Sequence, residues 1–355
     1  MSFKVCRTDP CIFYRFVEKH IIIISTHVDD MGLFANSTNE IKKVKGELSE
    51  HVSIKDLGEM KHILGLEISR DRKQRTISIS HRTYIDTILE RFGFDKSTPV
   101  LTPMDTNVRL SKEQSPQTDE ERDEMKTVPY QSAVGSLIHA AVMSRPDISY
   151  AVQQVAQYKS NPGRSHWTAT KRIFRYLKGT RDYTLTLGGK MNEIKLSAYS
   201  DSDFGMSKDH GRSIAGSALF LGSGCFHWSS KKQQAVALST PEAKLYAAVN
   251  TGRDIIWMRQ LLEELQTAQP SATALYMDAN SAIDIMLNEA KVSGRTRHIS
   301  IRHFWIREKT RAKDFIPEHV SSENNAADIF TKPLPNRDHQ RLIKLLGMTT
   351  RTDTR

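Results

Sequence analysis

Cysteine is scarce in this sequence, and long apolar runs are absent from it. The 355 residues include three cysteines, Cys6, Cys11 and Cys225, with no CxxC pair. A sparse, odd set of this kind argues against a disulfide scaffold and against a zinc knuckle. The longest purely aliphatic run, Ile21–Ile24, is far too short to span a bilayer, and the opening MSFKVCRTDP lacks the apolar core of a secretory signal. We therefore expect no membrane partner.

The charge balance is basic. The sequence has 51 Lys and Arg residues against 41 Asp and Glu residues, a formal net charge of +10, and its mean hydropathy is -0.48. A basic surplus of this size favours a polyanionic partner such as nucleic acid. The length indicates two domains or slightly more, and the 38% hydrophobic content is enough for real cores.

Hydrophobic patterning divides the chain into segments of different character. Up to about residue 98, apolar strands alternate with amphipathic helices, and a stretch rich in Ser, Thr, Pro and charge follows to residue 128. Residues 129–180 have helical spacing. From about residue 190, three strands precede a long helix capped by Ser239 or Thr240, and strands then alternate with helices. This order predicts an α/β (α+β) protein with a mixed sheet covered by helices.

In the last third of the chain, acidic residues fall where strands end and helices begin. Asp201 and Asp278 close predicted strands, Glu242 lies in the first turn of the long helix, and Asp328 opens the last helix. Each alone is more often a helix cap or dipole partner than a catalytic group. Four carboxylates at one sheet edge would need cations, and hard oxygen ligands suit Mg²⁺ or Mn²⁺. Because two such ions promote in-line phosphoryl transfer, a basic chain with this site has the profile of a nuclease.

A series of strings in this chain resembles the C-terminal part of the Pol polyprotein of copia-type LTR retrotransposons, where reverse transcriptase runs into RNase H. The strings include VDDM, DLGEMKHILGLEI, VPYQSAVGSLIHAA, YSDSDFG, STPEAKLYAA, DANSAI and NNAADIFTKPLP, in that order. The resemblance covers nearly the whole chain. It implies an RNase H-like mixed five-stranded sheet with helices. It also implies that Asp201, Glu242, Asp278 and Asp328 are catalytic ligands of Mg²⁺ or Mn²⁺, and that the RNA strand of RNA–DNA hybrids is cut.

The composition and the resemblance together predict a division into five parts. These are the C-terminal part of a reverse transcriptase palm (1–98), an exposed linker (99–128), a helical thumb or connection (129–185), an RNase H-like domain (186–335) and a basic tail (336–355). Expected partners are RNA–DNA hybrid, other nucleic acid, and other Pol or Gag products. The expected location is intracellular, in a cytoplasmic virus-like particle or the nucleus.

Asp29 and Asp30 lie between two short apolar runs, which predicts a hairpin turn. Adjacent carboxylates repel each other, so they are either solvated or held around a cation. The resemblance identifies the string HVDD as the metal-binding hairpin of the polymerase palm, which needs a third aspartate from an upstream strand. Only residues 1–28 precede Asp29. We therefore expect an incomplete polymerase site and no reverse transcriptase activity from this chain alone.

Basic residues alternate with aromatic ones in KRIFRYLKG. Lys171, Arg172, Arg175 and Lys178 could contact the phosphates of a duplex, and Lys231 and Lys232 are further candidates. The alternative is an amphipathic helix whose apolar residues face a core. Both can hold at once.

The roles of one aspartate and three histidines stay open. Asp203 is either an auxiliary ligand or a surface acid, and we expect the latter; His298, His303 and His319 are more often structural than catalytic. The leading hypothesis is a metal-dependent RNase H attached to a polymerase remnant. The alternative is a non-catalytic nucleic-acid-binding relic or a domesticated fragment. The complete set of four carboxylates favours the enzyme.

Overall fold

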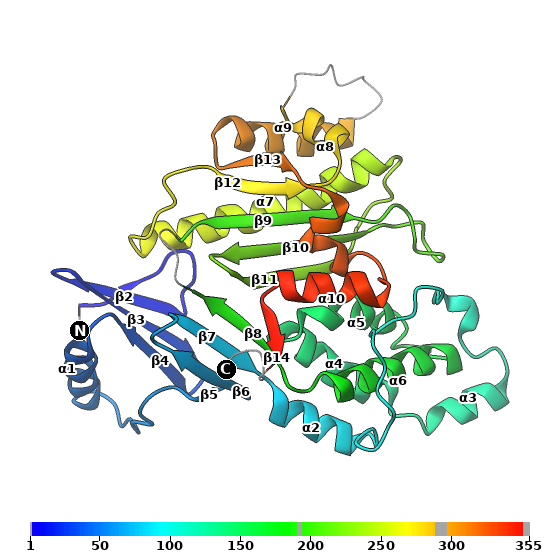
Figure 1. Ribbon diagram of the computed structural model, residues 1–355, viewed down its shortest axis with the longest axis horizontal. Helices are drawn as coiled ribbons and strands as arrows, with labels where there is room; N and C mark the ends of the chain where they lie inside the picture. Colours follow the sequence, from blue (N-terminus) through cyan, green and yellow to red (C-terminus); the bar gives the residue numbers. More distant parts are fainter. Residues whose placement is uncertain (1, 190–193, 288–296, 351–355) are drawn as a thin grey trace.

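The computed structural model describes residues 2–189, 194–287 and 297–350, with the backbone alone for residues 297–300. Within these residues the strands form three sheets, and helices pack against them (Figure 1). The strands are β1 (Lys4–Val5), β2 (Ile12–Val17), β3 (His20–His27), β4 (Asp30–Ala35), β5 (His62–Ile63), β6 (Leu66–Asp71), β7 (Thr76–Ser80), β8 (Tyr183–Gly188), β9 (Leu196–Ser202), β10 (Ile214–Leu221), β11 (Gly224–Lys232), β12 (Thr273–Met277), β13 (Phe315–His319) and β14 (Met348–Thr350).

The helices cover both the sheets and each other. The α-helices are α1 (Thr38–Ser49), α2 (Arg82–Arg91), α3 (Asp119–Lys126), α4 (Tyr130–Met143), α5 (Ser149–Ala156), α6 (Arg164–Gly179), α7 (Thr240–Glu264), α8 (Asn280–Leu287), α9 (Arg297–Arg311) and α10 (Asn336–Leu345). Short 3-10 helices are η1 (Lys112–Gln114), η2 (Pro146–Ile148), η3 (Ser322–Asn324) and η4 (Ala326–Phe330).

The first sheet contains the hairpin predicted around Asp29 and Asp30. Its order is β1-β2-β3-β4, all neighbours are antiparallel, and His27 pairs with Asp30 across the turn. Buried isoleucines of β3 pack against α1. The hairpin is therefore confirmed, and both aspartates are exposed. Val28 within the turn has a φ of 55°, a conformation that β-branched residues rarely adopt.

The second sheet joins three distant parts of the chain. Its order is β14-β8-β7-β6-β5, and every neighbouring pair is antiparallel. The segment expected as a basic tail (336–355) is folded in its described part. Helix α10 buries His339, Leu342 and Ile343, and β14 pairs with β8. One face of α10 is apolar, although the helix also carries charged residues.

The third sheet is the mixed five-stranded sheet that the sequence predicts, and the fold class is confirmed. Its order is β11-β10-β9-β12-β13. The strands β9, β10 and β11 are antiparallel neighbours, whereas β12 is parallel to both β9 and β13. The long helix α7 packs against β9 and β10 (Figure 1). The last helix expected before residue 332 is the 3-10 helix η4 rather than an α-helix.

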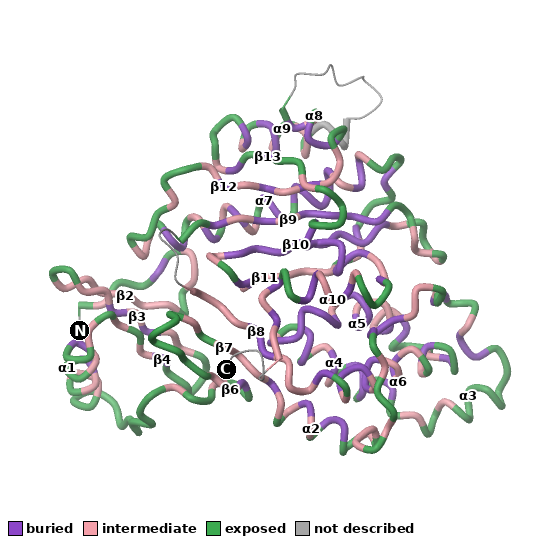
Figure 2. The backbone as a smooth tube through the Cα atoms, viewed as in Figure 1, coloured by how far each residue is buried: buried purple, intermediate pink, exposed green. Residues whose placement is uncertain are grey.

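A helical layer lies beside the second and third sheets. Helices α2, α4, α5 and α6 share one core, and Figure 2 shows buried backbone concentrated there and in β9 and β10. Met104 and Leu110 belong to this core, so the expectation of an exposed linker at residues 99–128 is wrong in this part. The reason is that the segment crosses α6, where Arg172 and Arg175 donate to its backbone carbonyls.

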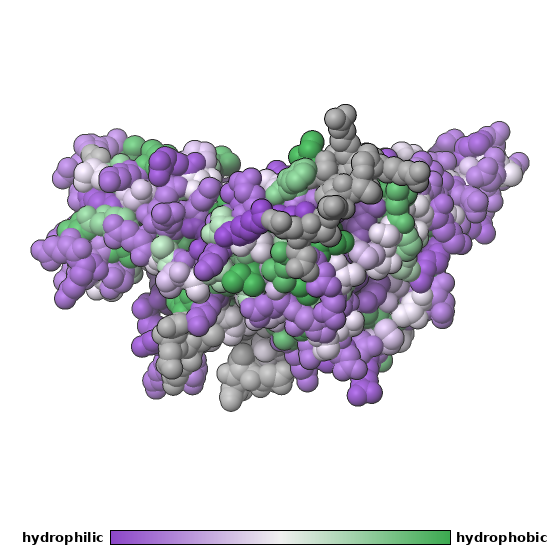
Figure 3. Space-filling model, turned by 90° about the horizontal axis from the view of Figure 1, so that it is seen from above, coloured by the Kyte–Doolittle hydropathy of each residue, from purple (hydrophilic) through white to green (hydrophobic). Residues whose placement is uncertain are grey.

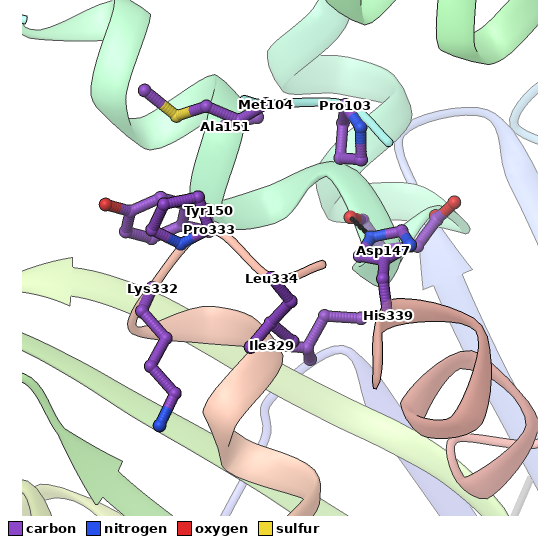
Figure 4. A pocket seen from close by; sticks show the side chains of 10 residues that line it. All are labelled: Pro103, Met104, Asp147, Tyr150, Ala151, Ile329, Lys332, Pro333, Leu334 and His339. Carbon is purple, nitrogen blue, oxygen red and sulfur yellow. Dashed lines mark hydrogen bonds between the residues drawn. The ribbon is translucent and has the colours of Figure 1, made fainter. Parts of the chain in front are cut away.

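A buried ion pair ties this helical layer to α10. Arg145 and Asp147 are each 1% exposed and form two hydrogen bonds, of 2.9 and 2.6 Å. Arg145 also donates to Thr180, and Tyr176 donates to Asp147. His339 of α10 reaches the backbone oxygen of Asp147. Figure 4 shows Asp147 and His339 together on one side of a cavity of about 10 Å³, which holds at most one water.

Acidification should destabilise the protein through His81. This side chain is 1% exposed, stacks on Tyr84 and lies beside His139, and neither of its ring nitrogens has a hydrogen-bond partner. Burial, and then electrostatic interactions with His139 and Arg145, lower the pKa of His81 to about 4. In the unfolded chain, His81 binds a proton below about pH 6.5. In the folded chain, it stays neutral down to about pH 4. The contribution of His81 falls by about 2 kcal/mol between about pH 7.5 and pH 5.

The measurement is urea unfolding of wild type and His81→Phe at these two pH values. Phenylalanine keeps the stacking but cannot titrate. On acidification, the variant should therefore lose about 2 kcal/mol less unfolding free energy than wild type. An equal loss in both proteins would show that His81 does not titrate in this range.

The surface seen from above is mostly hydrophilic, and hydrophobic residues form separate patches on this face (Figure 3). Among the residues that the structure describes, no helix combines the length and apolar character needed to cross a membrane.

Candidate active site

Three aspartates meet at one edge of the third sheet. Asp201 lies in β9 and Asp278 directly follows β12, and these parallel neighbours end at the same edge. Asp328 comes from η4, which packs on β10 where Gly216 leaves room; a Cβ there would lie 2.7 Å from the backbone oxygen of Ala327. One carboxylate oxygen from each aspartate lies within 4.8 Å of the others. Three such oxygens are chemically suited to a hard divalent ion.

A lysine ammonium already lies between two of these carboxylates. Lys244, in the second turn of α7, contacts Asp201 Oδ1 at 2.5 Å and Asp278 Oδ1 at 2.6 Å through Nζ. Its side chain is 12% exposed, against 2% and 9% for the two aspartates. Although burial disfavours an ammonium, the two carboxylates raise the pKa of Lys244, so it is charged at neutral pH.

The remaining carboxylate oxygens are nearly all bonded to protein groups. Thr331 donates to Asp201 Oδ2 and Ser322 donates to Asp278 Oδ2. Lys332 Nζ lies 2.6 Å from Asp328 Oδ2. Among these six oxygens, only Asp328 Oδ1 is buried without a partner. The donor set therefore has the right chemistry for Mg²⁺ or Mn²⁺ but, as arranged here, does not fit either ion, because lysines and hydroxyls use its oxygens.

Burial and charge move the pKa values of two of these aspartates in opposite directions. Burial opposes ionisation of Asp201, but the charge and hydrogen bond of Lys244 outweigh it and lower its pKa. For Asp328, burial and then the charge of Asp201 raise the pKa to about 7, although Lys332 opposes the rise. Lys244 thus holds Asp201 ionised, whereas Asp328 is protonated more readily than Asp201.

Glu242 lies outside this group of carboxylates. It occupies the first turn of α7, as expected, but its carboxylate accepts a hydrogen bond from the backbone of Leu238 at 2.9 Å. Its own backbone N–H donates to Ser239 Oγ, the helix cap. This is the capping arrangement weighed as the ordinary alternative. The role of Glu242 as a metal ligand stays a prediction. Its hydrogen bonds at the start of α7 do not favour that role.

Asp203 is not the surface acid that we expected. It is 8% exposed, and Oδ1 accepts a 2.5 Å hydrogen bond from the backbone of Ile214 while Oδ2 has no partner. Its position at the end of β9 explains the burial, because β10 returns directly against it.

The candidate histidines are spread along α9 and β13. His303 is half-buried, and burial and then Arg307 lower its pKa. His319 is exposed and pairs with Met277 in the sheet, next to Asp278. His298 falls where side chains are not described.

The other predicted site residues lie apart from the aspartates. Asp29 and Asp30 are at the hairpin of the first sheet. The predicted nucleic-acid-binding residues lie on α6 (Lys171, Arg172, Arg175 and Lys178) and at the end of β11 (Lys231 and Lys232). Arg172 and Arg175 bind backbone oxygens of the 98–105 segment, Lys232 donates to Gln157, and Lys231 is exposed. Their binding to nucleic acid stays a prediction.

Sequence reasoning missed Lys244, although a signal for it was present. Ala248, Thr251 and Ile255 are fully buried, and their spacing marks the face of α7 that packs on the sheet. Lys244 is one turn before Ala248 on this face. Glu242, two residues earlier, points about 200° away around the helix. Extending the apolar stripe backwards would have placed the lysine, and not the glutamate, toward the aspartates.

Comparison with known proteins finds relatives over almost the whole chain. Residues 1–106 match the family of reverse transcriptase (RNA-dependent DNA polymerase). The Pol polyprotein of transposon TNT 1-94 from Nicotiana tabacum is 40% identical over 342 residues, which is 96% of this chain and 26% of that polyprotein. The Pol polyprotein of transposon RE2 from Arabidopsis thaliana is 32% identical over 96% of this chain and 23% of its own length. The chain thus spans about a quarter of these relatives.

A shorter relative and a solved structure are also similar to this chain. The putative transposon Ty5-1 protein YCL074W of Saccharomyces cerevisiae is 30% identical over 69% of this chain and 77% of its own length. LC11-RNase H1, isolated from compost, superposes with a TM-score of 0.31 and 18% identity over 39% of this chain and 93% of its own. The series of motifs and these relatives together assign the chain to the Pol family of copia-type LTR retrotransposons.

Proposed function

We propose that this chain binds RNA–DNA hybrids at the edge of the third sheet where the aspartates meet, as the reverse transcriptase–RNase H region of a Pol polyprotein. The observation that carries this proposal is a group of cations at the same edge. Lys232 pairs with Ile214 in the sheet, and Gly216, two residues further along β10, pairs with Asp201. Lys232 on β11 and Asp201 on β9 are therefore two strands apart, at the same end of the strands.

We define the basic group as Lys112, Arg212 and Lys232, which act on one another electrostatically, together with Lys231, the exposed neighbour of Lys232 in β11. Burial, and then the positive charge of Arg212, lower the pKa of Lys232; the negative charge of Asp209 opposes this shift, and Lys112 adds to it. Cations that destabilise one another in the free protein gain when a polyanion neutralises them. A duplex backbone supplies regularly spaced phosphates for such a group. Lys171 and Lys178 on α6 are additional candidates, whereas Arg172 and Arg175 already hold the 98–105 segment.

Hybrid binding should depend on the exposed members of the basic group. In the double variant Lys112→Gln/Lys231→Gln, we expect hybrid affinity to depend less steeply on salt. The slope of log affinity against log salt concentration should decrease by the equivalent of about two phosphate contacts. The measurement is fluorescence anisotropy of a short labelled RNA–DNA hybrid over a range of salt concentrations. Lys42→Gln/Lys55→Gln, which removes two exposed lysines near α1, is the matched control. An equal fall in both variants would mean that binding follows net charge alone.

Metal-dependent cleavage of the RNA strand is the second candidate function, and the group of Asp201, Asp278 and Asp328 favours it. Lys244 argues against it, because its ammonium holds two of the three carboxylates. The same labelled hybrid, incubated with Mg²⁺ or Mn²⁺, decides between the candidates. Binding without cleavage supports the first. Cleavage by wild type that Asp278→Asn abolishes would establish the second.

The family membership also supports a wider setting for this chain. Association with other Pol or Gag products, and a place in a cytoplasmic virus-like particle or the nucleus, are part of this proposal. Co-purification with those products from cells that express the element would test it.

A further inference from the structure

We propose that Lys244 is the resident cation of the carboxylate site: its ammonium takes the place of a divalent ion, and the chain as it stands does not bind Mg²⁺ or Mn²⁺ there. This goes beyond hybrid binding, which requires neither the lysine nor a metal. The inference begins from position. Lys244 Nζ lies 2.5 Å from Asp201 and 2.6 Å from Asp278, so the space between these two oxygens is filled.

The helix holds this ammonium in place. The turns of α7 that follow Lys244 are anchored by Ala248, Thr251 and Ile255, which have no exposed surface. A tethered cation loses little translational freedom when it pairs, so its effective concentration at the carboxylates is far above that of a free ion. A divalent ion must therefore displace Lys244 before it can use the same oxygens.

The charge of the site also disfavours an added ion. Lys244 and Lys332 bring two positive charges to three carboxylates, and Lys332 is itself 2.6 Å from Asp328. A divalent ion added to this arrangement would reverse the sign of the site. Mg²⁺ in particular gives up its bound water reluctantly and requires a near-ideal octahedral arrangement of ligands. With five carboxylate oxygens already bonded to protein groups, too few remain for such a shell.

The alternative is that Lys244 only fills the site until metal arrives and then swings out. This alternative predicts that wild type binds metal readily. The two readings differ in the metal response of the wild-type chain, so they can be separated without any measurement of cleavage.

The test compares metal binding by the full chain and by Lys244 variants. Thermal unfolding and calorimetric titration with MnCl₂ and MgCl₂ are run at constant ionic strength on wild type, Lys244→Met and Lys244→Glu. We expect wild type to show no saturable Mn²⁺ binding that depends on Asp278, as judged by Asp278→Asn. Both lysine variants should melt lower than wild type without metal, because their carboxylates lose a partner. Mn²⁺ should restore them, with at least about ten-fold tighter binding than wild type.

A matched control separates a local effect from a change in net charge. Lys309 pairs with Asp314 at 3.5 Å, away from the group of three aspartates. Lys309→Glu makes the same charge change but should gain no metal response. If Lys244→Glu does not fold, Lys244→Met still carries the comparison. Wild-type Mn²⁺ binding as tight as that of Lys244→Met, or an unchanged melting temperature in Lys244→Met, would overturn the proposal. Hybrid anisotropy measured on the same variants reports separately on the proposed function.

Discussion

Replacing Asp147 by alanine should lower the free energy of unfolding by roughly 3–5 kcal/mol, because Arg145 is then left buried and without a charge partner. Arg145 is 1% exposed and donates two hydrogen bonds to Asp147. Burial opposes ionisation of Asp147, but Arg145 outweighs it and lowers its pKa, so the pair is ionic. Urea unfolding of wild type and Asp147→Ala measures the difference.

Two further variants show whether the loss comes from the unpaired charge. Removing both partners in Arg145→Met/Asp147→Leu should recover much of the loss, since replacing a whole buried pair by apolar groups is often nearly neutral. Asp182→Ala breaks a more exposed pair with Arg82, at 2.8 Å, and should cost less than about 1 kcal/mol. If Asp147→Ala lowers the free energy of unfolding no more than Asp182→Ala does, an unpaired buried Arg145 is not strongly destabilising, contrary to this prediction.

Asp201→Asn tests the sign of the electrostatics at the carboxylate site. If the aspartates repel one another around an empty metal position, removing one charge stabilises the fold. With Lys244 between them, Asp201→Asn instead weakens a buried ion pair at 2.5 Å. We expect a loss of roughly 3 kcal/mol, less than for a fully orphaned charge because Asp278 still pairs with Lys244.

The pairwise part of this effect is measured by a double-mutant cycle. Unfolding free energies are compared for wild type, Asp201→Asn, Lys244→Met and the double variant. A favourable coupling energy of about 1 kcal/mol or more between Asp201 and Lys244 is expected, because the two side chains are in direct contact. A gain in stability for Asp201→Asn would contradict the resident-cation account directly.

The sequence predicted the third sheet well because its signals are local. Short apolar segments bounded by turn residues mark its strands, and Ser239, one of the two expected N-caps, caps α7. Strand ends placed Asp201 and Asp278 near each other, since Asp201 lies in β9 and Asp278 directly follows its parallel neighbour β12. Glu242 and Lys244 are two positions apart in one helix. Which of them faces the aspartates depends on the face of the helix that packs on the sheet, and acidic character alone does not indicate that face.

Other parts could not be read from local pattern. The strands β8 and β14 are short and find their partners far along the chain, so no nearby residue marks them. In the 99–128 segment, Met104 and Leu110 are isolated apolar residues within polar surroundings. Only the packing of that segment on α6 explains their burial. The relation between sequence and structure is thus weakest where contacts are least local.

The second sheet has a consequence for how the chain folds. Ser78 of β7 contacts Thr186 of β8 across 108 residues, and Thr184 of β8 contacts Thr349 of β14 across 165 residues. The helical layer is inserted between β7 and β8, and the whole third sheet is inserted between β8 and β14. Closing such long loops costs entropy before the pairing rewards it, which slows folding. On a ribosome this sheet stays incomplete until β14 emerges. The edge of β8 is meanwhile open to pairing with other chains.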